Sequence, residues 1–332
     1  MEMRVAAIDL GTVSSRLSLA TVRDGAIASL EKRTVITDLG EGVDATGRLS
    51  DAAVERVLAA CEGFREQIGL FGPRATCTTL TSAARDAENG VVLLDGLRAL
   101  GLEPQIIPGE VEARLTFYGV AHDFMGERIV VADSGGGSTE LALGRYGARG
   151  EGEGAELALD AARSLNVGCR RVTERFFSAL PPVVGEVEEA AAWARGVFEP
   201  CWRELGLLGG GLVRLVAVGG TVTTLVAMLK EMAVYDSSLV HLERLGLTEV
   251  EGVVERLARL SADQVAALPG IQPKRAPVIL GGAVIIRELM RSGGFTELTV
   301  SENSLLAGMA ATMFEVLSGE APAIGWEPRF SR

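Results

Sequence analysis

The segment that decides the fold is Arg128-Ile-Val-Val-Ala-Asp-Ser-Gly-Gly-Gly-Ser-Thr-Glu-Leu-Ala-Leu143. An apolar run ends at Asp133, a glycine-rich turn follows, and a second apolar run begins after Glu140. Two short apolar runs on either side of a glycine turn predict two β-strands joined by a tight connection.

The residues of this turn suit phosphate. Three glycines let backbone N–H groups face an anion without a Cβ in the way, and Ser138 and Thr139 add hydroxyl donors. Asp133 and Glu140 flank the turn, and Mg²⁺ is typically held by one or two carboxylates together with phosphate oxygens and water. The glycines are Gly135, Gly136 and Gly137. We therefore predict a site for phosphate and Mg²⁺, with a plain glycine hairpin as the alternative.

The same pattern occurs once before in the chain. An apolar run from Arg4 ends at Asp9, and a short turn leads into the alternating residues 16–22. The two aspartates are 133 − 9 = 124 residues apart, and such self-similarity predicts two related halves that face each other across a cleft. An arginine in this first turn can bind a phosphate through two N–H groups, although the turn taken alone fits an ordinary connection equally well. Its candidate phosphate-binding residues are Gly11, Thr12, Ser14 and Arg16.

A third glycine turn follows the apolar run Leu215–Val218, which reads as a buried strand that leads into a helix. Its candidate phosphate-binding residues are Gly219, Gly220 and Thr221, and close packing of helix on strand is the alternative. Further strands at 75–80, 105–108 and 298–301 alternate with amphipathic helices. This alternation predicts an α/β fold.

Local signals predict where several helices begin. Ser50 is a plausible N-cap for the helix that follows it. Thr248 with Glu251, and Ser261 with Gln264, have the spacing of capping boxes. We expect the last helix to run over residues 304–317.

Composition excludes several classes of protein. With 332 residues the chain is long enough for two domains. Lys plus Arg number 32 against 44 for Asp plus Glu, a formal net charge of −12, which argues against non-specific binding to nucleic acid. No apolar run reaches the roughly 18 to 20 residues of a membrane span, and no signal peptide is recognisable. We therefore expect a cytoplasmic protein without membrane or nucleic-acid partners, whose four scattered cysteines stay reduced.

Missing motifs narrow the chemistry further. The sequence has two histidines, His122 and His241, too few for most histidine-based metal sites. It contains neither a Gly-x-Gly-x-x-Gly fingerprint nor a Gly-Lys-Ser/Thr P-loop. Any phosphate must therefore be bound by a glycine-rich turn of another kind.

In these three glycine turns and in several segments between them, the chain resembles the exopolyphosphatase and guanosine pentaphosphate phosphatase (Ppx/GppA) family. The segment Gly109-Glu-Val-Glu-Ala-Arg-Leu115 is similar to the family's Gly-x-x-Glu-Ala-Arg-Leu motif, and the three glycine turns stand in the family's order. The tract Thr81-Ser-Ala-Ala-Arg85 is similar to its Thr-Ser-Ala-x-Arg motif, and Asn166-Val-Gly-Cys-Arg170 to its glycine-containing strand end. The resemblance covers about residues 5 to 312.

The resemblance implies a two-domain fold like that of actin, sugar kinases and Hsp70, built from duplicated ribonuclease-H-like halves with a central active-site cleft. We expect an N-terminal domain over 1–123, which the last helix (about 304–320) rejoins, and a C-terminal domain over 124–303. The chain resembles the short, two-domain form of the family. A homodimer and a monovalent cation beside Mg²⁺ are further features that the resemblance raises.

The resemblance also assigns roles to individual residues. Glu112 would be the catalytic base, and Arg85 and Ser138 would hold the substrate phosphate. The acids Asp133 and Glu140 would bind Mg²⁺ and position water, with Asp9 as a further metal ligand. Residues of the three glycine turns would bind phosphate.

The activity that the resemblance implies is Mg²⁺-dependent release of terminal phosphate from inorganic polyphosphate. Hydrolysis of the 5′ γ-phosphate of pppGpp is the nearest alternative, since both substrates end in a phosphoanhydride. Val13 stands where the family usually has asparagine, which leaves a non-catalytic sensor of nucleotide or polyphosphate as a further alternative. An ATP-binding kinase or ATPase of the same fold is a rival that does not depend on Val13.

Overall fold

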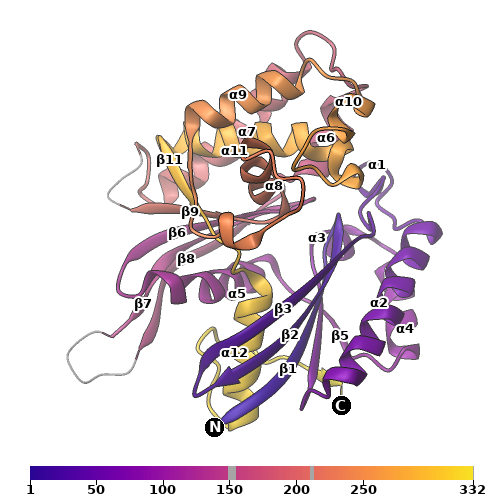
Figure 1. Cartoon of the computed structure of the whole chain (residues 1–332), viewed down its shortest axis with the longest axis vertical. Coiled ribbons are helices and arrows are strands. Elements are labelled where there is room, and N and C mark those ends of the chain that lie inside the picture. Colours follow the sequence, from indigo (N-terminus) through magenta and orange to yellow (C-terminus); the bar gives the residue numbers. More distant parts are fainter. Residues whose placement is uncertain (149–154, 210–212, 332) are drawn as a thin grey trace. The chain divides into compact units, whose positions relative to one another are not determined.

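The computed structural model describes residues 1–148, 155–209 and 213–331. The chain divides into two compact units. Unit 1 comprises Met1–Glu127, Arg145–Ala158 and Asn303–Arg332, and unit 2 comprises Arg128–Gly144 and Leu159–Glu302. Each unit is built on a six-stranded sheet (Figure 1). The predicted domain limits at residues 123 and 303 stay predictions.

The sheet of unit 1 has the strand order β12-β4-β1-β2-β3, and β5 pairs with β4. The chain enters it through an antiparallel meander of β1, β2 and β3, and β4 then joins β1 in parallel. The strands are β1 (Glu2–Leu10), β2 (Ser14–Arg23), β3 (Ala26–Ile36), β4 (Thr76–Leu80), β5 (Pro104–Ile106) and β12 (Phe330–Ser331).

Strand β1 is apolar from Val5 to Ile8, where both of its faces are buried, as expected for a strand covered by helices on both sides. Successive side chains point to opposite faces. Ala6, Ile8 and Leu10 belong to one core cluster with residues of α2 and α4, and Val5 and Ala7 belong to another with residues of α5 and α12. The helices of unit 1 are α1 (Val43–Thr46), α2 (Asp51–Phe71), α3 (Ser82–Asp86), α4 (Gly90–Ala99), α5 (Gly109–Ala121), the 3₁₀ turn η1 (His122–Phe124) and α12 (Leu305–Ser318).

The sheet of unit 2 has the order β10-β11-β9-β6-β7-β8 and packs on one large apolar cluster in which α11 takes a central part. Its strands are β6 (Arg128–Ser134), β7 (Thr139–Gly147), β8 (Glu156–Leu165), β9 (Arg214–Val218), β10 (Arg244–Gly246) and β11 (Glu297–Val300). Its helices are α6 (Cys169–Phe176), α7 (Glu186–Glu204), α8 (Gly220–Leu229), η2 (Ser237–Leu239), α9 (Leu247–Leu257), α10 (Ala262–Ala266), η3 (Pro273–Arg275) and α11 (Ala276–Gly293).

The two sheets repeat one topology. In unit 1 a parallel neighbour, β4, lies beside the first strand of the meander β1-β2-β3, and in unit 2 the parallel neighbour β9 lies beside the first strand of β6-β7-β8. Strand β1 therefore corresponds to β6, and the β1–β2 turn corresponds to the β6–β7 turn. The self-similarity of the sequence reflects this repeat.

Most predicted helix starts are confirmed, and one is wrong. Ser50 Oγ accepts from the Ala53 N–H at the start of α2, and Ser261 with Gln264 forms the expected capping box of α10. Helix α9, however, begins at Leu247, and the carboxylate of Glu249 accepts from the Gly246 N–H at 2.8 Å. Glu251, the predicted capping residue, instead bonds Arg291 of α11. The Glu251 side chain, which the spacing predicted to cap the helix, thus forms an ion pair with Arg291 instead.

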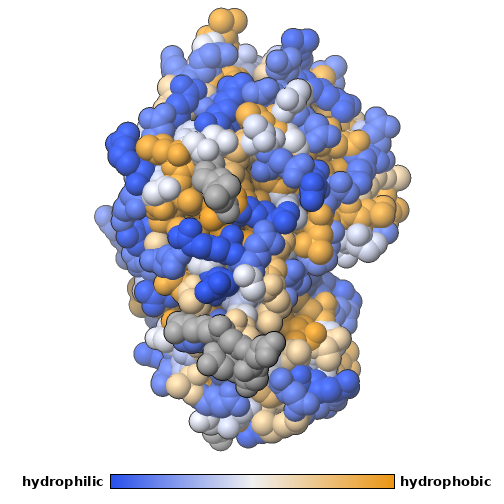
Figure 2. Space-filling view, turned by 90° about the vertical axis from the view of Figure 1, so that its left-hand side faces the viewer, coloured by the Kyte–Doolittle hydropathy of each residue, from blue (hydrophilic) through white to orange (hydrophobic). Residues whose placement is uncertain are grey.

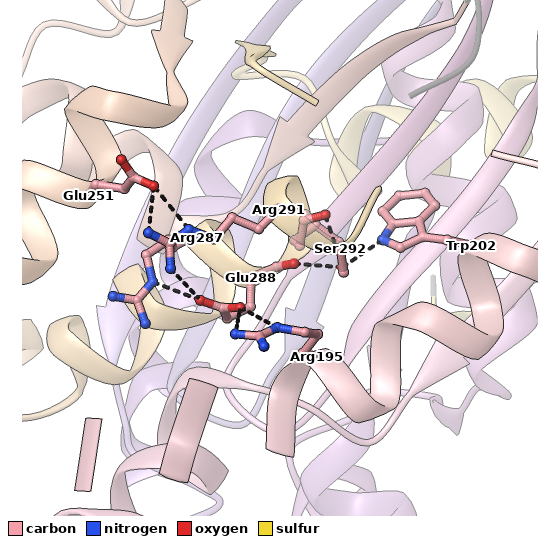
Figure 3. A network of polar contacts seen from close by, with 8 residues as sticks. Arg195, Trp202, Glu251, Arg287, Glu288, Arg291 and Ser292 are labelled. Atoms are coloured by element: carbon pink, nitrogen blue, oxygen red, sulfur yellow. Dashed lines mark hydrogen bonds and ion pairs between the residues drawn. The ribbon is translucent and has the colours of Figure 1, made fainter. Parts of the chain in front are cut away.

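A buried carboxylate ties α11 to its neighbours (Figure 3). Glu288 is fully buried, and its oxygens accept from Arg195 of α7 and from Arg287 and Arg291 of α11. A buried charge requires such partners, because leaving it unpaired in the interior costs several kcal/mol. This network and the apolar cluster together fix the helix that packs behind α6 and α8.

The surface mixes polar and apolar side chains (Figure 2). The most exposed large hydrophobic residues of the described chain are Leu70 in α2 and Val184 and Val234 in two different loops. Scattered exposed apolar residues are normal for a folded protein. All four cysteines are buried and free. Among the helices of the described ranges, none combines the length and the apolar composition that a bilayer crossing requires.

Candidate active site

The two predicted aspartates occupy equivalent places in the repeated topology. Asp9 is the last residue but one of β1, and Asp133 is the last but one of β6. Both are buried, with 1% and 5% of their surface exposed. The turns after them close in the same way: the Gly11 N–H donates to Ser14 O at 3.0 Å, and the Gly135 N–H donates to Ser138 O at 3.0 Å. We call residues 10–14 turn 1 and residues 134–139 turn 2.

The carbonyl groups of turn 2 point toward the start of α6. Gly135 O accepts from the Cys169 N–H at 3.0 Å, and Gly136 O accepts from the N–H groups of Arg170 and Arg171 at 2.9 and 3.2 Å. Gly137 O accepts from Arg171 Nε at 2.9 Å. The N–H groups in the first turn of α6 therefore donate to carbonyl groups of turn 2 and are not directed at a ligand.

This arrangement fixes the direction of three N–H groups. In a trans peptide the C=O of one residue and the N–H of the next point in opposite directions. Because the carbonyls of residues 135–137 face α6, the N–H groups of Gly136, Gly137 and Ser138 face away from it. In the part of the chain that the structure describes, none of these three N–H groups has an acceptor. Convergent N–H groups of this kind bind anions.

Turn 1 is held from behind by a loop instead of a helix. Thr12 O accepts from the Gly40 N–H at 2.8 Å, and Val13 O accepts from the N–H groups of Thr37 and Asp38 at 3.1 and 3.0 Å. By the same peptide geometry, the N–H groups of Val13 and Ser14 face away from residues 37–40. The side chain of Val13 is buried, so this position contributes only its backbone.

The third glycine turn lies against Asp133. In the parallel pairing of β6 with β9, Asp133 is opposite Val218, and Gly219 follows with a φ of 100°. A Cβ at Gly219 would lie 2.9 Å from Asp133 Oδ1 and 3.0 Å from Ser134 O. Glycine is required here both by the left-handed backbone and by this close approach.

Gly220 begins α8, and the guanidinium of Arg275 packs directly on it. A Cβ at Gly220 would lie 1.8 Å from Arg275 Nη1. Burial raises the pKa of the Cys169 thiol, an effect opposed by the nearby guanidinium groups of Arg275 and Arg170 and by a hydrogen bond with Thr221. Sequence reasoning missed Arg275. It is the last residue of η3 and the N-cap of α11, and no local signal places it beside α8.

Glu140, the second predicted acid of unit 2, is 2% exposed near the start of β7. Its Oε1 accepts from Ser164 Oγ of β8 at 2.7 Å, and the preceding Thr139 donates its hydroxyl to Val167 O at 2.6 Å. The Thr139 hydroxyl is therefore engaged with the backbone and supports the turn. Its predicted contact with phosphate stays a prediction.

In unit 1, Asp9 pairs with a residue that was predicted to bind phosphate. Arg16 lies opposite Asp9 in the β1–β2 ladder, and its Nε and Nη2 donate to Asp9 Oδ2 at 2.9 and 2.5 Å. The other oxygen, Oδ1, is buried and has no hydrogen-bond partner in the described residues. A buried carboxylate oxygen without a donor suits a hard cation, since such an atom is costly to leave unsatisfied.

Glu112 and Arg85 form a second charge pair in unit 1. Arg85 Nη1 donates to Glu112 Oε2 at 2.7 Å and to Ile107 O at 3.0 Å. Arg85 lies in the last turn of α3, and Glu112 lies in the first turn of α5, where its residue is 7% exposed. Glu112, which the resemblance implies is the catalytic base, therefore accepts a hydrogen bond from Arg85, the arginine that the resemblance implies binds the substrate phosphate.

The structure thus brings the predicted residues together as two sets, each within one unit. Unit 1 joins Asp9 with Arg16 and Arg85 with Glu112, and unit 2 joins Asp133 with the third glycine turn. Over the described ranges, no group of three or more His, Cys, Asp or Glu side chains is placed to hold one metal ion. Mg²⁺ needs only one or two carboxylates when phosphate oxygens and water complete its shell, and the buried acids fit that requirement.

Comparison with known proteins identifies the family. The sequence profile of the Ppx/GppA phosphatase family matches residues 18–315. The chain belongs to this family. Exopolyphosphatase 2 of Mycobacterium tuberculosis is 36% identical over 327 residues, which cover 93% of this chain and 98% of that protein.

Solved structures of Ppx/GppA proteins share the fold. An exopolyphosphatase-like protein matches with a TM-score of 0.84 and 31% identity, covering 95% of this chain and 99% of that one. The Ppx/GppA family member of Aquifex aeolicus matches with a TM-score of 0.76 and 28% identity, covering 96% and 99%. The predicted family and the predicted α/β fold are therefore confirmed.

Proposed function

We propose that this Ppx/GppA protein is a Mg²⁺-dependent exopolyphosphatase that releases orthophosphate from the end of inorganic polyphosphate. The observation that carries the proposal is the set of three convergent N–H groups in turn 2, beside the buried carboxylate of Asp133. The exopolyphosphatase name of the Mycobacterium tuberculosis relative supports it.

Hydrolysis of a phosphoanhydride depends on positioning and on neutralising the charge of the transferred phosphoryl group. The N–H groups of Gly136, Gly137 and Ser138 bind oxygens of the terminal phosphate. Phosphatases of this family generally depend on a divalent metal. We propose Mg²⁺, for which Asp133, Glu140 and Asp9 are the candidate ligands; one or two of these carboxylates would bind it together with phosphate oxygens and water. When bound, Mg²⁺ supplies positive charge to the phosphate oxygens.

Glu112 accepts the proton of the attacking water. A carboxylate can orient a water molecule and take its proton as the oxygen attacks phosphorus. The bond from Arg85 Nη1 to Glu112 Oε2 fixes the orientation of this carboxylate. The guanidinium of Arg85 also stabilises negative charge on the substrate phosphate, and a phosphate competes with Glu112 for its N–H donors.

Two alternatives use the same residues. The γ-phosphate of pppGpp is also a terminal phosphoanhydride, and turn 2 binds phosphate without reading the group behind it. A non-catalytic sensor would keep the turns but would not turn the substrate over. At Val13 the side chain is buried, so this position contributes only its backbone to turn 1.

The test is phosphate release by the purified protein from inorganic polyphosphate and from pppGpp, with and without Mg²⁺. We expect faster release from polyphosphate and none after chelation of the metal. Replacing Glu112 with Gln keeps the shape of the side chain and removes the base, so Glu112→Gln should lower kcat by about 10²- to 10⁴-fold.

Glu110→Gln is the matched control. Glu110 lies in the same first turn of α5 but is exposed, and its replacement should leave kcat unchanged. Equal turnover by Glu112→Gln and the wild-type protein would disprove the role of Glu112. Tight binding of polyphosphate without any release by the wild-type protein would support the sensor instead.

A further inference from the structure

One of the three carbonyl groups behind turn 2 is held by a side chain. The carbonyls of Gly135 and Gly136 accept from backbone N–H groups of α6, which no substitution except proline removes. Gly137 O accepts from Arg171 Nε at 2.9 Å. The direction of the Ser138 N–H therefore depends on the side chain of Arg171.

We propose that Arg171 is a positioning residue for phosphate binding, because its Nε–H holds the peptide between Gly137 and Ser138. This inference rests on the proposed function of turn 2. Glycine restricts its backbone least of all residues, so the peptide after Gly137 can rotate easily once its carbonyl is released. Rotation would turn the carbonyl oxygen toward the phosphate in place of the Ser138 N–H and would replace attraction with repulsion.

Arg171 acts through this hydrogen bond and not by direct contact with the substrate. Its Nε bonds the carbonyl side of the turn, and the three N–H groups face the opposite way. The neighbouring Arg170 takes a different partner, since its Nη1 bonds Glu174 Oε1 at 3.1 Å. Two adjacent arginines at the start of α6 thus have different roles.

Substitutions of matched length can separate an effect of the Arg171 Nε–H hydrogen bond from an effect of the Arg171 charge on the substrate. Glutamine places an N–H donor at the position of the arginine Nε but carries no charge. Methionine has a stem of similar length without a donor, and lysine keeps the charge but moves the donor one atom further out. We expect Arg171→Met to lower kcat/KM by about 10- to 100-fold, the effect of losing one hydrogen bond to a charged group. We expect Arg171→Gln to stay within about threefold of the wild-type protein, since it keeps that bond.

Binding provides a second readout that does not depend on turnover. Inorganic tripolyphosphate with Mg²⁺, titrated by calorimetry into the Glu112→Gln background, should bind about 10-fold more weakly or worse when Arg171 is methionine. With glutamine at this position the Kd should be restored. Arg175→Met is the matched control, because Arg175 lies one turn further along α6 and packs on the ring of Trp193. It should change neither kcat/KM nor the Kd.

The outcomes distinguish the possibilities. Activity of Arg171→Lys with loss in Arg171→Gln would show that the charge acts and would overturn the inference. Equal values of kcat/KM and of the Kd for tripolyphosphate in Arg171→Met and the wild-type protein would also overturn the inference. If Arg171→Met fails to fold, the comparison of glutamine with lysine still decides. If the wild-type protein neither releases phosphate nor binds tripolyphosphate, the proposed function fails and this role fails with it.

Discussion

Turn 1 and turn 2 have the same backbone plan but differ in what their acids contact. In both turns the first glycine N–H donates to the serine carbonyl three residues later, and the carbonyls are drawn back by a neighbouring segment. In turn 1, Asp9 accepts two hydrogen bonds from the guanidinium of Arg16, and beside turn 2 Glu140 accepts one from the hydroxyl of Ser164. The pairing neutralises much of the charge of Asp9.

This difference indicates a division of labour after duplication. Turn 2 presents three N–H groups with buried acids, a combination suited to phosphate together with a cation. Turn 1 presents two N–H groups and one carboxylate oxygen without a donor. We expect turn 2 to dominate substrate binding and turn 1 to have a smaller role.

The largest effect should separate the two aspartates. Asp133→Asn should lower kcat/KM by about 10²- to 10³-fold, since a bound cation stabilises the transition state by several kcal/mol and each 1.4 kcal/mol is tenfold in rate. Asp9→Asn should cost only about tenfold, because Arg16 already offsets the charge. Phosphate-release kinetics at saturating Mg²⁺ measure both. An equal loss in the two variants would remove the distinction between the turns.

The second effect is on stability, and it concerns the side chains that hydrogen-bond Asp9 and Glu140. Arg16→Met leaves Asp9 buried and unpaired and should lower the free energy of unfolding by about 3 kcal/mol. Ser164→Ala removes one hydrogen bond to the Glu140 carboxylate and should cost about 1.5 to 2 kcal/mol. Urea unfolding measures both values. Added Mg²⁺ should restore part of the loss in Arg16→Met if Asp9 is a metal ligand; stability independent of Mg²⁺ would speak against that role.

The third effect tests the segments behind the turns. A Cβ at Gly168 would lie 2.4 Å from the carbonyl carbon and oxygen of Gly136, so Gly168→Ala must displace the backbone of turn 2. A Cβ at Gly40 would lie 2.2 Å from Cγ2 of Thr12, a side-chain atom that can move. We expect Gly168→Ala to cost about 1 to 3 kcal/mol in stability, with a parallel loss of tripolyphosphate affinity, and Gly40→Ala to cost less. The reverse order would mean that turn 1 is the more constrained of the two.

The smallest effect should come from Cys169. Its backbone N–H holds Gly135 O, and its thiol does not. Cys169→Ala keeps that N–H and should leave kcat/KM within about twofold, well below the tenfold that 1.4 kcal/mol would give. Because burial raises the pKa of this thiol, it should stay protonated at pH 8 and react slowly with iodoacetamide. Rapid alkylation of Cys169 in the native protein would show that the start of α6 opens.

Much of the fold was predictable because its signals are local. Short runs rich in apolar and β-branched residues marked β1, β4, β6 and β9, and a serine before an amphipathic run marked the start of α2. The predicted cap of α9 was wrong because two candidate spacings overlapped, Gly246 with Glu249 and Thr248 with Glu251. The choice depended on Arg291, which is distant in sequence and draws Glu251 away.

The candidate site was predictable as a set of residues but not as a set of contacts. The glycine turns and their acids could be read from residue type and spacing. The pairing of Arg85 with Glu112 joins residues 27 positions apart, and that of Asp9 with Arg16 depends on the register of the β1–β2 ladder. Arg275 and Arg171 were missed because nothing local shows that they contact Gly220 and Gly137.

The sequence by itself therefore determined that two aspartates end equivalent strands and that glycine-rich turns follow them, because strand alternation and glycine turns are properties of adjacent residues. Only the tertiary structure decided which way the peptides of those turns face. The carbonyls of Thr12 and Val13 point to donors in residues 37–40, and those of Gly135, Gly136 and Gly137 point to donors at the start of α6. Since a trans peptide couples its C=O and N–H, those distant donors decide what each turn can bind.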